Sequence, residues 1–190
     1  MTDLALPRPV AVYDASVLYP SLIRNLLMHL GTEGLVAARW TAQIHDEWTR
    51  NLLEDRPDLT PERLARTRQQ MQLALPDAEV EGFEPLIATL SLPDPDDRHV
   101  LAAAVHTEAE LIVTQNLKHF PAQVLTSHGL EALTPDALLC RLLDAEPAAG
   151  RAAVEKLRAS FRKPPYDTAQ LLTRLSEVGL GEAAKRLEED

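Results

Sequence analysis

The chain has 190 residues, of which 45% are hydrophobic, so it is long enough for one packed domain with a small additional segment. Its single cysteine excludes a disulfide scaffold and a multi-cysteine metal site. No apolar run in the sequence approaches the roughly 18 residues that a transmembrane helix needs. The first 16 residues do not resemble a signal peptide, because they contain Asp3 and two prolines. We therefore expect a soluble, cytoplasmic protein.

Charge is unevenly distributed along this acidic chain, whose net charge is −10. Residues 1–144 hold 21 acids and 11 bases, whereas residues 145–190 hold 8 of each. Because affinity for phosphates comes from Lys and Arg, a protein with this charge is a poor non-specific nucleic-acid binder. A divalent cation would have to neutralise the carboxylates before nucleic acid could approach them.

The predicted elements of the first half begin with a short apolar run. Residues 10–13 indicate a buried strand, and 18–30 carry apolar residues at helical spacing, with Gly31 as a stop signal. A second helix is predicted over about 41–54. A third runs over about 60–75 and is opened by a threonine cap followed by proline.

A loop over 76–83 is followed by a helix from about 94 to 107, a strand at 111–114 and a weaker strand at 130–133. Helices that alternate with short β-rich runs predict an α/β protein. We expect an open parallel β-sheet flanked by helices in three layers.

The end of the chain reads as a small helical extension, and we place the boundary between 1–144 and 145–190. Residues 148–162 have helical apolar spacing, Pro164-Pro165 breaks the chain, and Asp167 or Thr168 caps another helix that ends at Gly179. So short a segment buries little core alone, which predicts that it docks on the main domain, on a second subunit or on a partner.

Two polar side chains follow predicted strands. Asp14 comes directly after the first strand, and Asn116 lies two residues beyond Thr114 at the end of the second. In a parallel sheet, ligands bind at the carboxyl ends of the strands, so both side chains are candidates for one crevice. The structural alternatives are a capping or turn aspartate and a loop asparagine.

Three acids, Asp94, Asp96 and Asp97, surround Pro95 at a predicted helix start. Helix capping explains one of them, whereas three carboxylates in four residues repel one another unless a cation lies between them. Glu47 lies near the core-facing side of its helix, where a carboxylate needs a partner or a metal; the alternative is a solvent-exposed glutamate.

Other catalytic signals are missing from the sequence. The six histidines show no zinc spacing and are interpreted mostly as surface or core residues. Serine-hydrolase, Walker and dinucleotide-binding motifs are also absent from the sequence.

Four stretches in sequence order resemble the PIN domain family, the metal-dependent nucleases that include VapC-type toxins. They are VYDASVLYPS, the helix containing HDEW, DPDDRHVLAAAV and LIVTQNLKHFP, within about residues 8–140. The tail resembles the C-terminal extension of one branch of these toxins. The resemblance implies a PIN-like, Rossmann-like fold and a site formed by Asp14, Glu47, Asp97 and Asn116. Many members have an aspartate at the position of Asn116.

The resemblance further implies an endoribonuclease that uses Mg²⁺ or Mn²⁺, which hard oxygen ligands suit. Asp14 and Asp97 would bind the metal directly, with Asp94 as the second choice for the ligand from the DPDD segment. Glu47 would bind the metal through water or act as a proton acceptor. Asn116 would position metal or water. Flanking phosphates are expected to be bound by Arg98, Lys118 and Arg50. Hydrogen-bonding support for the acids is expected from Ser16 and Thr114.

The expected partners are an RNA substrate, a cognate antitoxin and a second copy of the chain, and no membrane. Two other classes of function stay open. One is a non-catalytic PIN-like module that binds RNA or protein, which Asn116 and the acidic charge favour. The other is a phosphoesterase that acts on small molecules with the same kind of sheet.

Overall fold

The computed structural model describes residues 8–189, and the predicted absence of a leader concerns residues 1–7, outside this range. Four parallel strands form one sheet in the order β2-β1-β3-β4. The strands are β1 Val10–Tyr13, β2 Ala37–Arg39, β3 Leu111–Val113 and β4 Glu131–Leu133. The predicted parallel α/β architecture is therefore confirmed.

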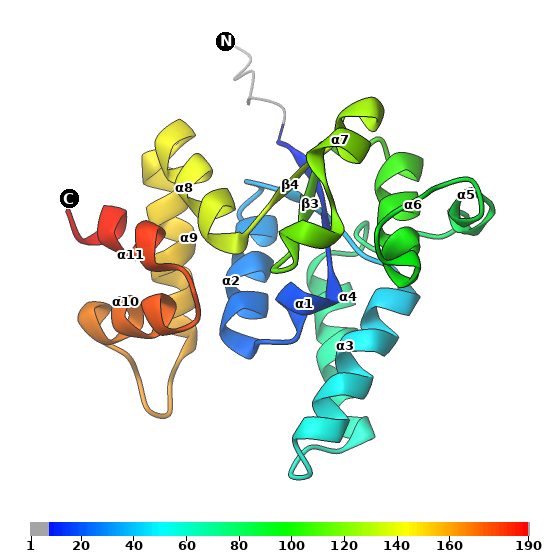
Figure 1. Cartoon of the computed structure of the whole chain (residues 1–190). Coiled ribbons are helices and arrows are strands. Elements are labelled where there is room, and N and C mark those ends of the chain that lie inside the picture. The colour runs from blue at the N-terminus through cyan, green and yellow to red at the C-terminus, as the bar shows by residue number, and fades with distance from the viewer. Residues whose placement is uncertain (1–7, 190) are drawn as a thin grey trace.

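Helices cover both faces of the sheet (Figure 1). α5 and α6 lie on one side, whereas α2, with α8 and α9 beyond it, lies on the other. The helices are α1 Ala15–Leu18, α2 Ser21–Thr32, α3 Ala42–Asp55, α4 Pro61–Ala74, α5 Glu84–Ile87, α6 Arg98–His106, α7 Ala122–Leu125, α8 Pro135–Ala145, α9 Pro147–Ser160, α10 Thr168–Glu177 and α11 Gly181–Glu188. Short 3₁₀ turns are η1 Pro95–Asp97, η2 Leu117–His119 and η3 Thr126–His128.

The helix predicted over 18–30 is wrong at both ends. Pro20 has an extended backbone (ψ 123°) and separates α1 from α2, since a proline cannot continue the hydrogen bonding of the preceding turn. Gly31 does not stop the helix, which continues to Thr32. The chain turns instead at Gly34, whose φ of 76° is the left-handed conformation that glycine adopts without strain.

Five further elements were not predicted: β2 and the helices α5, α7, α8 and α11. β2 is a run of two alanines and an arginine, without the β-branched residues that mark a strand, and its pairing with β1 places it in the sheet. The other predicted helices and strands are present to within a few residues. Thr60 caps α4 with Pro61 in its first turn, and Asp167 caps α10.

The hydrophobic core extends from the sheet into the C-terminal helices. Tyr13, Trp40 and Trp48 are fully buried near β1 and α3, and Leu157 of α9 and Leu175 of α10 belong to the same cluster of buried side chains. α9 packs on α2, and Lys156 on it forms an ion pair of 2.6 Å with Glu33 just after α2. Three docking surfaces were predicted for the C-terminal segment: the main domain, a second subunit or a partner. In the structure the segment packs on the main domain.

Candidate functional site

The carboxyl ends of β1 and β3 lie side by side, at the point where the strand order reverses. Tyr13 pairs with Val113, so the next residues, Asp14 and Thr114, meet across the edge of the sheet. The Asp14 amide donates to the Val113 carbonyl oxygen at 3.0 Å. This edge is where ligands bind in open α/β sheets.

Asp14 is 4% exposed, and its carboxylate is held by three donors. Oδ1 accepts from the Ala15 amide at 2.8 Å, and Oδ2 accepts from Ser16 Oγ at 2.6 Å and Thr114 Oγ1 at 2.7 Å. Asp14 is therefore the helix cap that the structural alternative predicted. Since a carboxylate has about four acceptor positions, one position on Oδ1 is still free for a ligand.

Asn116 follows the same strand end but is exposed. The backbone amide of Asn116 donates to Thr114 Oγ1 at 3.0 Å, and its backbone carbonyl accepts from the His119 backbone amide at 2.9 Å. No described residue forms a hydrogen bond to its side chain, which leaves the amide oxygen available. The hydrogen bonds of its backbone hold η2, and with it His119, beside the end of β3.

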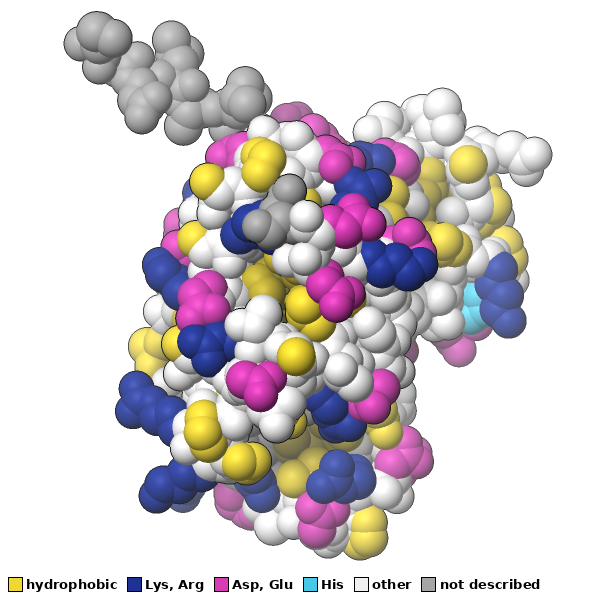
Figure 2. All heavy atoms as spheres, turned by 90° about the vertical axis from the view of Figure 1, so that its left-hand side faces the viewer, with side chains coloured by type: hydrophobic (Ala, Val, Ile, Leu, Met, Phe, Trp, Pro, Cys, Tyr) yellow, Lys and Arg dark blue, Asp and Glu magenta, His cyan; other side chains and the backbone are white. Residues whose placement is uncertain are grey.

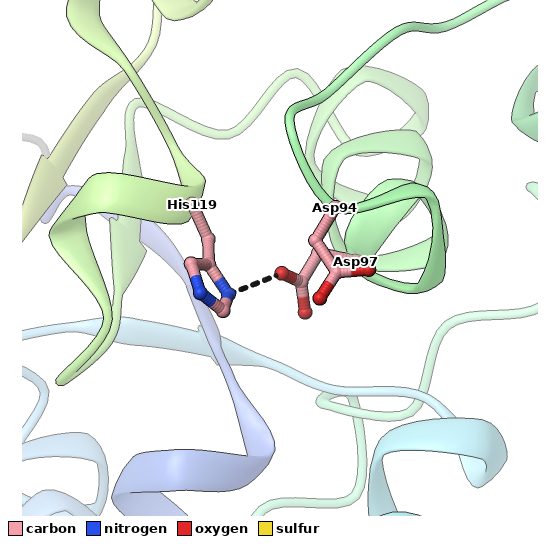
Figure 3. A group of neighbouring side chains, drawn as sticks. All are labelled: Asp94, Asp97 and His119. Atoms are coloured by element: carbon pink, nitrogen blue, oxygen red, sulfur yellow. Dashed lines mark hydrogen bonds and ion pairs between the residues drawn. The ribbon is translucent and has the colours of Figure 1, made fainter.

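The second acidic segment enters the site at η1, ahead of α6. Asp94 caps this turn, because its Oδ1 accepts from the Asp96 amide at 3.0 Å. Asp97 points instead toward His119, whose Nδ1 lies 2.7 Å from Asp97 Oδ2 (Figure 3). Polar atoms of Asp94, Asp97 and His119 all lie within 4.8 Å of one another, the closest such group among the described residues that could hold a metal.

The electrostatics of Asp97 show that the acids gather. Its pKa is raised, mainly because burial disfavours the charged carboxylate, and the charges of Asp14 and Asp94 raise it further. The hydrogen bond from His119 acts in the opposite direction. A cation beside Asp97 would relieve the same repulsion.

Glu47 approaches from α3 on the far side of a cavity of about 560 Å³. Asp97 and Arg50 line the same cavity. Glu47 Oε2 lies 3.6 Å from Nε2 of His99, a buried histidine whose Nδ1 has no partner among the described residues. The cavity thus places two carboxylates of α3 and two of η1 around a single space, namely Asp46, Glu47, Asp96 and Asp97.

The predicted phosphate-binding residues are only partly brought together. Arg50 lines the cavity beside Glu47, and Lys118 lines a second cavity of about 340 Å³ next to Asp94 and His119. Arg98 lines neither cavity, and its Nε donates to the Pro95 carbonyl at 3.0 Å.

The sequence analysis missed His119, which was treated as a surface or core residue. The signal was available, because His119 follows Asn116 at the same strand end. The cluster of possible metal ligands also differs from the predicted one. It contains Asp94, Asp97 and His119, whereas Asp14 and Glu47 lie outside it and border it.

The oxygen atoms of this cluster fit a hard divalent cation. Asp97 Oδ1 and Asp94 Oδ2 accept no hydrogen bond from another described residue, so both oxygens are free to bind. Carboxylate oxygens are the ligands that Mg²⁺ and Mn²⁺ prefer, and no thiolate lies in the group.

The fold and site together define an α/β protein with a cluster of acids at one edge of a parallel sheet. Comparison with known proteins identifies its class: a model of the PIN domain family matches residues 10–118, more than half of the chain. The chain belongs to the PIN domain family. A second family model, described as the VapC50 C-terminal domain, matches residues 135–189.

A curated protein of Mycobacterium tuberculosis, named "Putative ribonuclease VapC50", is 42% identical over 96 residues. The alignment covers 50% of this chain and 56% of that protein. No solved structure matches the chain. Among the described residues, every helix is too short or too polar to cross a membrane.

Proposed function

We propose that the protein is a metal-dependent endoribonuclease that hydrolyses RNA phosphodiester bonds as the toxin of a toxin–antitoxin pair. The observation that carries the proposal is that acids of α3 and of the η1 segment line cavities that also contain Arg50 and Lys118. Asp14, at the end of β1, is near enough for its charge to raise the pKa of Asp97. Membership of the PIN domain family and the name of the mycobacterial relative support it.

The cation-binding residues in this proposal are Asp14, Asp94 and Asp97, with Mg²⁺ or Mn²⁺ as the ion. When bound, the ion neutralises charge on the phosphate and makes a bound water more acidic. Ser16 and Thr114 fix the Asp14 carboxylate through hydrogen bonds of 2.6 and 2.7 Å. These bonds fix the direction of the Asp14 carboxylate, whose remaining acceptor position would be available to the ion.

Glu47 accepts the proton of the attacking water in this proposal, since its carboxylate borders the cavity and is 34% exposed. Asn116 orients water through its free amide oxygen, and His119 holds Asp97 by its Nδ1 contact. Arg50 and Lys118 bind flanking phosphates. Arg98 has this role only if its guanidinium leaves the Pro95 carbonyl.

The proposal includes a cognate antitoxin, a homodimer and a cytoplasmic location. We also retain residues 1–144 as the nuclease domain and 145–190 as the helical extension. The family model that begins at residue 135 suggests that α8 accompanies the extension.

The test is cleavage of transfer and ribosomal RNA with Mn²⁺, with EDTA, and by the variants Glu47→Gln and Asp97→Asn. We expect EDTA to abolish cleavage and each variant to lower its rate about a hundredfold or more. Glu54→Gln is the matched control, because Glu54 is exposed on the same helix and does not line the cavity. Asp14→Asn is a weaker test, since an amide cannot accept all three hydrogen bonds.

Calorimetry with Mn²⁺ separates the alternatives. Wild-type protein should bind Mn²⁺, and Asp97→Asn should lose most of the affinity. Absence of Mn²⁺ binding together with absence of RNA cleavage would indicate a non-catalytic binding module. Turnover of p-nitrophenyl phosphate without RNA cleavage would indicate a small-molecule phosphoesterase. Equal cleavage in every sample would identify a contaminating nuclease.

A further inference from the structure

A third cavity, of about 350 Å³, lies where the ends of α1 and α3 meet the starts of α2 and α4. None of its residues belongs to the site described above. It combines arginines with a tyrosine hydroxyl group and leucines, among them Tyr19, Arg24, Leu52, Arg56, Arg63 and Leu64. A cationic cavity is unexpected in a chain whose net charge is −10.

Arg24 is the unusual residue of this cavity, because it is only 8% exposed and has no acidic partner among the described residues. Its Nη1 donates to the carbonyls of Leu18 and Tyr19, at 2.6 and 3.4 Å, and its guanidinium stacks on the Trp48 ring at 4.7 Å. Its buried Nε has no hydrogen-bond partner. Burial lowers the pKa of Arg24 to about 10, which a bound anion would reverse.

Arg63 and Arg56 supply the exposed side of the cavity. The Arg63 guanidinium forms no hydrogen bond or ion pair with another described residue, whereas Arg56 is paired with Asp58 at 2.7 Å. Asp55 is also near, since it accepts from the Tyr19 hydroxyl at 2.7 Å. Three guanidiniums thus face two carboxylates, and an excess of positive charge is left.

The cavity lies close to the proposed catalytic edge. Asp14 caps the start of α1, and Tyr19 caps its end. At about 1.5 Å of rise per residue, the two residues are about 7 Å apart along the helix axis. A single RNA strand would span this separation within a few nucleotides.

We propose that this cavity binds the phosphate of a nucleotide that flanks the cleaved bond, with the base of that nucleotide against the leucines. The inference rests on the proposed ribonuclease function and assigns Arg24, Arg56 and Arg63 to the substrate. Guanidinium groups match phosphate oxygens by paired hydrogen bonds, and the buried Leu52 and Leu64 offer an apolar surface to a base. An acidic protein segment would use the arginines but gains nothing from the proximity to Asp14.

The decisive variant is Arg63→Ala, because Arg63 is exposed and has no structural partner through its guanidinium among the described residues. Arg66→Ala is the matched control, since Arg66 is exposed on α4 and does not line the cavity. Binding of a fluorescein-labelled, mixed-sequence single-stranded RNA is measured in EDTA at low salt, so that the RNA stays intact.

We expect Arg63→Ala to weaken RNA binding about tenfold and to reduce the slope of log affinity against log salt by about one. Arg66→Ala should stay within about twofold of wild type. In Mn²⁺-supported cleavage, Arg63→Ala should raise KM with little change in kcat, as expected for a group that binds substrate and transition state equally.

A second measurement is independent of RNA sequence. In ¹⁵N NMR, titration with a nucleoside 5′-monophosphate should shift the Arg24 Nε–H resonance, and Arg63→Ala should weaken that shift.

The outcomes separate the two proposals. RNA bound in an Arg63-dependent way but never cleaved would refute the ribonuclease and leave an RNA-binding cavity. RNA cleaved by wild type and Arg63→Ala with equal KM and equal affinity would refute the cavity and leave the ribonuclease. An Arg24 resonance that moves only with an acidic peptide would assign the cavity to a protein segment and overturn the inference.

Discussion

Neighbouring groups shift the pKa of the Asp97 carboxylate in opposite directions. His119 donates a hydrogen bond that favours its charged form, whereas burial and the charges of Asp14 and Asp94 disfavour it. Metal ligands are often held in this way by a hydrogen-bonding neighbour, which fixes their direction. His119 is in this respect as much a part of the proposed site as the acids themselves.

His45 makes a pH-dependent contribution to stability. It is 3% exposed, its Nδ1 accepts from the Trp48 indole at 2.9 Å, and its ring lies between Trp40 and Trp48. Burial, helped by the charge of Arg68, lowers its pKa to about 4 from an ordinary value of 6.5. The unfolded chain therefore takes up a proton at a pH where the folded protein does not.

The contribution of His45 is complete above pH 6.5 and is lost as the pH falls toward 4. We expect a loss of up to about 3 kcal/mol in the free energy of unfolding across this interval, measured by urea denaturation in EDTA. His45→Gln should flatten the dependence, and His128→Gln, at an exposed position, should not change it. An unaltered slope in His45→Gln would contradict the assignment.

Thr41 caps the start of α3, the helix that carries Glu47. Thr41 is fully buried, and its Oγ1 accepts from the Ile44 amide at 3.1 Å. Thr41→Ala should lower the free energy of unfolding by about 1–2 kcal/mol, because a buried amide loses its acceptor.

Thr41→Ser is the matched control, since it keeps the hydroxyl group and should retain most of the stability. Urea denaturation of both variants checks the expectation. If the serine variant lost as much as the alanine variant, packing of the threonine methyl group, and not the cap, would be the cause.

Elements with strong local signals were predicted from the sequence. Val10–Tyr13 and Leu111–Val113 are apolar runs with β-branched residues, and α4 begins with a cap and a proline. β2 was missed because its residues have no strand preference of their own. Gly31 was misassigned since a glycine is compatible with a helix interior when a neighbour, here Leu75, packs against it.

At the scale of the molecule, the C-terminal helices complete the core. The face they present is mixed, with acidic, basic and apolar side chains interspersed (Figure 2). Underneath, α9 packs on α2, and the side chains of both belong to one hydrophobic cluster. We therefore expect the chain to unfold in a single calorimetric transition.

Leu157→Ala tests this coupling, because Leu157 is fully buried on α9. It should lower the free energy of unfolding by about 2–5 kcal/mol and move the whole transition. Lys156→Ala should cost less than about 1 kcal/mol, since the Lys156 side chain is 57% exposed. Two transitions, of which Leu157→Ala moved only one, would mean that the extension folds separately.

Local chemistry along the chain was sufficient for the class of fold and for most helices, because periodicity, caps and strand ends are properties of neighbouring residues. It made Asp14, Glu47 and Asp97 candidates, and only the family resemblance joined them into one predicted site. Tertiary structure alone decided that the end of β1 lies against the end of β3 and that His119 reaches Asp97. It also decided that Arg24 shares one cavity with Arg56 and Arg63, more than 30 residues further along the chain. Such contacts join residues through packing, which no short stretch of sequence specifies.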